Sequence, residues 1–159
     1  MPVSQQIMLW TLAVIAPVIL NLSIRRGSDA LGLSAMLLLA WCLGRITGAL
    51  YSPPESMALY PIVDALSGAI AFVAWRTRPA WWKLALVGLF VTQSTLHAAF
   101  WLAWPQGASL YHYVLVNNVL FIGELITVSV PGGAYVLGRT LGYLSDRARG
   151  VHHARARRG

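Results

Sequence analysis

Four ionisable residues interrupt long apolar segments of this sequence, and they are the positions best suited to chemistry: Arg45, Asp64, His97 and Glu124. An arginine can hold an anion through two parallel hydrogen bonds, and a histidine can change its charge near neutral pH. Ionisable groups are costly inside hydrocarbon, so each needs a partner or a water-filled cavity. Glu124 has no basic residue near its own depth, which makes it the best single functional candidate.

Three of these residues fall at a similar depth in their apolar segments. Each residue is counted from the end of its own apolar segment, taking the ends that would lie on one common side of a membrane. Arg45 is then five residues in, Asp64 six and His97 seven. In helices these separations correspond to about 8 to 11 Å. The sequence therefore predicts that chemically complementary side chains share one layer.

Further polar residues lie in the last apolar segment. Asn117 and Asn118 are at nearly the same level as that layer, and Glu124 lies deeper, near the middle. A polar path could thus lead inward to Glu124. We predict a polar pocket or relay made of Arg45, Asp64, His97, Asn117, Asn118 and Glu124.

The same residues also admit a purely structural interpretation. Arg45 and Asp64 can form a buried ion pair, while His97 and the asparagines only tie helices together. The sequence leaves both interpretations open.

Other chemistry is not indicated. The chain has no Gly-rich phosphate loop, no nucleophile with a base at suitable spacing and no zinc-protease motif, which favours a protein that is not an enzyme. Cys42 is the only cysteine, so a disulfide or cysteine cluster within the chain is excluded. His97 and His112 differ in depth and make a poor haem pair. We predict no cofactor and no metal.

The elements that must position these residues are five apolar runs of 18 to 22 residues, near 7–24, 30–50, 58–75, 83–104 and 110–130. A helix of that length crosses the roughly 30 Å of hydrocarbon in a bilayer. The chain is 57% hydrophobic and only 11% charged, unlike a soluble domain. We predict an all-α membrane protein, a bundle of five transmembrane helices. Its first run is expected to be a retained span rather than a signal peptide.

The distribution of basic residues predicts the orientation of this bundle. Of the 12 basic residues, all except Arg45 lie in the first gap, the third gap or the segment after the fifth run. By the positive-inside tendency the N-terminus is outside and the C-terminus cytoplasmic, in the inner membrane if the protein is bacterial. Six basic residues are predicted to contact anionic lipid headgroups: Arg25, Arg26, Arg76, Arg78, Lys83 and Arg139.

The C-terminal part is predicted to leave the bundle. Pro131-Gly132-Gly133 is expected to break the fifth span. Residues 134–144 would then form a short interfacial helix, which completes a transmembrane domain over residues 1–144. Residues 145–159 are expected to be a basic, disordered cytoplasmic tail.

Two classes of function follow from these features. In the first, the polar pocket opens outward and handles protons, ions or a small solute. In the second, the protein is an accessory subunit or a lesion-forming protein; phage holins share its small size, short loops and basic tail, although no motif carries that likeness. The bilayer is the expected partner, a homo-oligomer or larger membrane complex remains open, and nucleic acid is less favoured than lipid.

Overall fold

The computed structural model describes residues 3–24, 28–51 and 53–156, and its elements are helices. They are α1 (Val3–Leu22), α2 (Asp29–Leu50), α3 (Pro53–Thr77), α4 (Trp81–Ala103), the short 3-10 helix η1 (Trp104–Gln106) and α5 (Leu110–Ala156). The predicted all-helical fold is confirmed. Five helices are long and apolar enough to cross a membrane, as expected for a multi-pass membrane protein.

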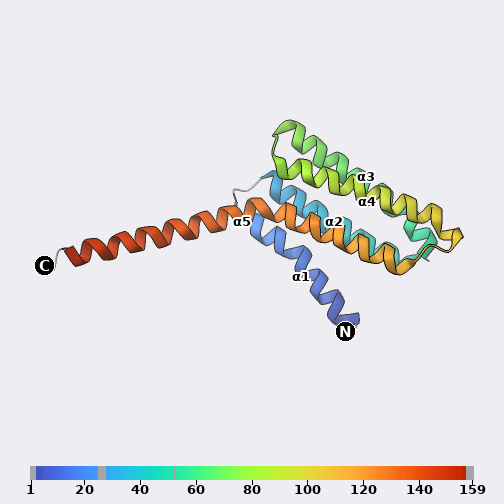
Figure 1. Ribbon diagram of the computed structural model, residues 1–159, viewed down its shortest axis with the longest axis horizontal. Helices are drawn as coiled ribbons and strands as arrows, with labels where there is room; N and C mark the ends of the chain where they lie inside the picture. The colour runs from blue at the N-terminus through green and yellow to red at the C-terminus, as the bar shows by residue number, and fades with distance from the viewer. Residues whose placement is uncertain (1–2, 25–27, 52, 157–159) are drawn as a thin grey trace.

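Four helices form the bundle that carries the site. Figure 1 shows α2, α3, α4 and the first part of α5 packed lengthwise, while α1 diverges from them toward its N-terminal end. The second part of α5 continues well past the bundle. The bundle therefore has two ends: the Lys83 end, where α2 and α4 begin, and the Tyr51 end, where α2 finishes.

Lys83 corrects one prediction, because it does not face lipid headgroups. Its side chain is only 3% exposed, and its Nζ lies 2.5 Å from Asp29 Oδ2. Nζ also donates to the carbonyl oxygens of Ala74 and Arg78, at 2.8 and 2.7 Å. An ammonium has three donors, and all three are engaged here. Lys83 thus joins the start of α2 and the end of α3 to α4.

The other predicted headgroup residues divide into two groups. Arg76, Arg78 and Arg139 are exposed. Arg25 and Arg26 lie outside the described residues.

Pro131 corrects a second prediction, since α5 passes through it without a break and extends over 47 residues. The helix crosses α1 here. The Asn21 amide donates to Ser34 Oγ at 2.7 Å and to the Val128 carbonyl at 2.9 Å. Pro131 removes the donor for the Thr127 carbonyl, and Asn21 bonds to the next carbonyl along the helix, so α1 contacts the backbone of α5 directly beside the proline.

Gly132 makes the crossing of α1 and α5 close. A Cβ added to it would lie 2.8 Å from Asn21 Oδ1 and 2.8 Å from the backbone carbon of Leu20. The Pro-Gly-Gly segment is therefore a helix-packing site, and residues 134–144 continue α5 rather than forming a separate helix. The tail, predicted to be disordered, is helical through Ala156.

The half of the bundle nearer the Lys83 end is filled by apolar side chains. Its core consists of Leu33, Leu37, Ala71, Leu86, Phe90 and Val128, each at most 3% exposed. Buried polar side chains at this level, such as Asn21 and Ser34, are bonded to each other and to the backbone rather than to an open pocket. The predicted polar set lies beyond this core, toward the Tyr51 end.

Candidate functional site

A pocket of about 480 Å³ lies among α2, α3, α4 and α5, and α1 contributes Trp10 to its wall. Every residue of the predicted polar set lines it: Arg45, Asp64, His97, Asn117, Asn118 and Glu124. Leu37 and Phe90, which belong to the apolar core, lie at its inner end. The structure thus brings the six predicted residues around one cavity.

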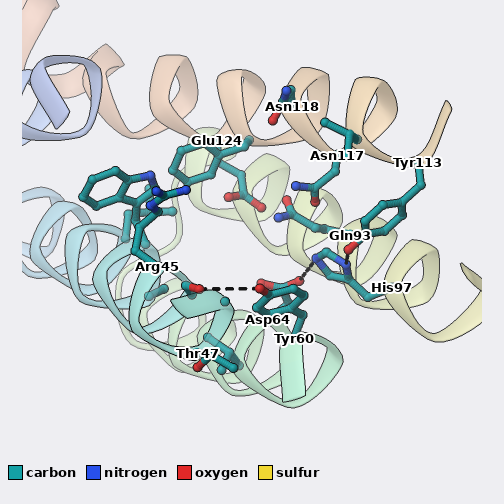
Figure 2. Close-up of a pocket in the computed structure, with 18 of the residues that line it drawn as sticks. Arg45, Thr47, Tyr60, Asp64, Gln93, His97, Tyr113, Asn117, Asn118 and Glu124 are labelled. Atoms are coloured by element: carbon teal, nitrogen blue, oxygen red, sulfur yellow. Dashed lines mark hydrogen bonds and ion pairs between the residues drawn. The ribbon is translucent and has the colours of Figure 1, made fainter. Parts of the chain in front are cut away.

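Asp64, His97 and Tyr113 form a connected chain across α3, α4 and α5 (Figure 2). Asp64 Oδ2 lies 3.0 Å from His97 Nε2, and His97 Nδ1 lies 2.5 Å from the Tyr113 hydroxyl oxygen. The three residues are 8%, 4% and 7% exposed. Both ring nitrogens of His97 are therefore engaged, and its orientation is held from two sides.

The chemistry of this chain depends on where the protons lie. An ionised carboxylate can only accept, so the Asp64 contact favours a proton on Nε2. In the neutral ring, Nδ1 then accepts a hydrogen bond from the Tyr113 hydroxyl group. In a doubly protonated ring, Nδ1 donates a hydrogen bond to the Tyr113 oxygen. The Tyr113 contact is therefore compatible with either form of the ring.

Beside this chain, several buried oxygens face the pocket without a donor. Gln93 Oε1, Asn117 Oδ1 and Glu124 Oε1 have no hydrogen-bond partner among the described residues. Asp64 Oδ2 has its close contact with His97 but no hydrogen bond of good geometry. Glu124 is 1% exposed and Gln93 6%. Buried acceptors without a donor are costly, so these oxygens are suited to accept hydrogen bonds from water or a ligand in the cavity.

Figure 2 shows the Gln93 and Asn117 amides on the stretch of pocket wall between Glu124 and His97. It shows Asn118 turned away from this group. Adjacent residues on a helix point about 100° apart, so the two asparagines cannot both face the same centre. Asn117 is the asparagine that belongs to the polar centre, and Asn118 lies at the pocket's edge.

Arg45 lines the pocket but does not form the ion pair with Asp64 that the sequence allowed. Asp64 pairs with His97 instead, and Arg45 has no ion pair within the described residues. The Arg45 side chain is exposed, whereas Asp64 is buried. The carboxylate therefore lies deeper in the bundle than the guanidinium that was expected to neutralise it.

Gly44 and Gly48, whose spacing permits close helix approach, face an aromatic ring. The Tyr60 hydroxyl donates to the Gly44 carbonyl at 3.5 Å, and a Cβ on Gly48 would lie 3.3 Å from that hydroxyl oxygen. The ring centroids of Tyr60 and His97 are 5.3 Å apart. The two glycines make room for Tyr60, which in turn packs beside His97.

Three residues of the site were not in the predicted set: Tyr60, Gln93 and Tyr113. Helical spacing could have identified them. Gln93 precedes His97 by one turn, and Tyr113 precedes Asn117 by one turn, so each shares a helix face with a predicted residue.

The described residues contain no group of three His, Cys, Asp or Glu side chains that could hold a metal ion. His97 is held by Asp64 and Tyr113, and His112 is exposed on the surface. Neither the position of His112 nor the contacts of His97 fit a haem ligand.

The chain matches no protein-family model, no curated protein and no solved structure in the comparisons made. The functional argument therefore depends on the chemistry of the pocket.

Proposed function

We propose that this protein handles protons, ions or a small polar solute at the pocket of α2 to α5. The observation that carries the proposal is the set of unpartnered oxygens on Gln93, Asn117 and Glu124 inside one cavity. A protein that used these residues only to join helices would pair them with one another.

The Asp64–His97–Tyr113 chain supports proton handling in particular. The His97 ring contacts a carboxylate through one nitrogen and a hydroxyl through the other, which is an arrangement suited to proton transfer. Glu124 is a second group able to accept a proton. Gln93 and Asn117 supply hydrogen-bonding groups between these two centres, on which water or a solute can be held.

Flux measurements in proteoliposomes test this proposal. Proton or solute flux through the wild-type protein should fall about tenfold or more in Glu124→Gln and in Asp64→Asn, because each change removes a carboxyl group that can bind and release a proton. Thr92→Val is the matched control, since Thr92 is exposed on α4 and donates only to the Gly88 carbonyl. Unchanged flux in both pocket variants would refute the proposal.

The topology proposed with this function has the N-terminus outside and the C-terminus in the cytoplasm, with the pocket opening outward. The exposed Arg76, Arg78 and Arg139 would then meet anionic headgroups of the inner leaflet. Accessibility of single cysteines introduced at each end, in a Cys42→Ser background, tests it. Labelling of both termini from one side would refute it.

A second candidate function is assembly, as an accessory subunit or a lesion-forming protein. It is favoured by the exposed apolar side chains of α5 beyond the bundle, where Leu137 is 60% and Leu141 57% exposed. Such a protein should tolerate Asp64→Asn and Glu124→Gln. Toxic expression with loss of membrane potential, unaffected by these substitutions, would favour this candidate.

A further inference from the structure

We propose that the pocket binds an amphiphile with a primary ammonium head, whose apolar tail leaves the protein sideways between α2 and α5. This inference rests on the proposed function and names the ligand class. It is argued from three features: the acceptors inside the pocket, the aromatic residues around them and the position of the mouth.

The inner wall of the pocket offers acceptors in excess of donors. Gln93 Oε1, Asn117 Oδ1 and Glu124 Oε1 are unpartnered, and the Gln93 and Glu124 side chains are more than nine-tenths buried. A primary ammonium carries three N–H donors and a positive charge. It can donate to these three oxygens, and its charge is matched by Glu124 once that carboxyl group is ionised. A quaternary ammonium has the charge without the donors, and an anion has no donor to offer these oxygens.

Aromatic rings line the same cavity. Trp10, Trp41, Tyr60, Phe90 and Phe121 all contribute to its wall. A ring face attracts a cation within about 6 Å of its centroid, and more strongly when water is excluded. These rings also provide apolar surface for the first carbons of a tail.

The mouth is identified by which lining residues are exposed. The exposed lining residues belong to α2, its C-terminal cap and α5, whereas the lining residues of α3 and α4 are buried or half-buried. The rim of the mouth consists of Arg45, Gly48, Tyr51, Leu110 and Val114. Tyr51 and Leu110 lie at one end of the bundle, where α2 ends and α5 begins. Because α2 and α5 are long and apolar enough to span a membrane, the part of the opening that lies between the two helices would meet lipid. Leu110 and Val114 are 44% and 43% exposed and give the rim apolar surface. A ligand with an apolar tail fits such an entrance.

The test compares two cations of equal charge and equal chain length, one with three N–H donors and one with none. The full chain, in phosphatidylcholine nanodiscs, is titrated with octylammonium and with octyltrimethylammonium. Loss of hydrogen bonds to a charged group should weaken binding of the trimethyl compound about tenfold or more. Gln93→Met and Glu124→Gln should each weaken octylammonium binding by a similar factor, while Thr92→Val should not. Equal binding of the two cations would overturn the proposal. Binding of neither cation would also overturn it if the lipid headgroup tested in the second arm has no effect.

A second arm identifies the source of the ammonium. If it is a lipid headgroup, nanodiscs of phosphatidylethanolamine should raise the thermal unfolding midpoint relative to phosphatidylcholine, and Gln93→Met should abolish the increase. If octylammonium binds but the lipid has no effect, the ligand is a free amine. No effect in either arm overturns the proposal. Proton flux that requires Glu124 in the same preparation would then leave the proposed function standing.

Discussion

Gly132→Ala should destabilise the protein through a single added methyl group. The Cβ would lie 2.8 Å from Asn21 Oδ1, 2.8 Å from the Leu20 backbone carbon and 2.9 Å from the Leu20 carbonyl oxygen. Two of these atoms belong to the backbone of α1, so no side-chain rotation can relieve the contact. Either α1 or α5 has to move. That movement would strain the bonds from Asn21 to Ser34 Oγ and to the Val128 carbonyl.

The magnitude follows from two opposing effects. Alanine is favoured over glycine inside a helix by about 0.5 to 1 kcal/mol, and forcing a methyl group into a packed contact costs about 1 to 3 kcal/mol. Gly133→Ala isolates the first effect, because a Cβ at Gly133 meets no atom within 4 Å. The free energies of unfolding of the two alanine variants should therefore differ by up to about 3 kcal/mol, with Gly132→Ala the less stable.

Reversible unfolding in mixed detergent micelles, followed by circular dichroism, measures this difference. The comparison is between adjacent positions on one helix, so effects of helix propensity cancel. Equal stability of the two variants, to within about 0.5 kcal/mol, would refute the close crossing of α1 and α5 at Gly132.

Two further predictions concern buried polar contacts, and both are measured by the same unfolding assay. Lys83→Met should lower the free energy of unfolding by about 3 kcal/mol, because it leaves the partly buried Asp29 carboxylate without its cation and removes one donor each from the Ala74 and Arg78 carbonyl oxygens; adding Asp29→Asn should restore part of the loss, and full additivity of the two changes would contradict the pairing. Tyr113→Phe should cost about 1 to 2 kcal/mol, because His97 Nδ1 loses its partner, whereas Tyr111→Phe at a 73% exposed position should have no effect. Similar values for the two tyrosine variants would contradict the assigned contact.

The span pattern and the polar layer were predictable from the sequence because both depend on sequence distance alone. A long apolar run specifies a helix of nearly fixed length, and depth along that helix follows from residue number. This reasoning placed Asp64 and His97 at one level, and the structure puts them 3.0 Å apart. It could not select the partner of Asp64, because that choice depends on how each helix is rotated about its axis.

Lys83 and Pro131 show the limits of the same reasoning. A lysine beside a turn is most often solvated, and only the packing of three helix ends shows that Lys83 is buried and bonded within the chain. A Pro-Gly-Gly segment ends most helices, but its effect depends on the neighbour. Here α1 bonds to the backbone of α5 and packs against Gly132, so the helix continues.

The uninterrupted α5 has a mechanical consequence. The helix that presents Tyr113, Asn117 and Glu124 to the pocket also forms the projection beyond the bundle, as a single hydrogen-bonded rod. At about 1.5 Å per residue this rod extends about 12 Å from Glu124 to Gly132 and about 18 Å from Gly132 to Leu144, so tilting it by about 10° about Gly132 displaces Leu144 by about 3 Å. A tilt of α5 caused by a ligand in the pocket therefore produces a larger displacement on the far side of the bundle. The pivot of this tilt is the close contact between α1 and Gly132.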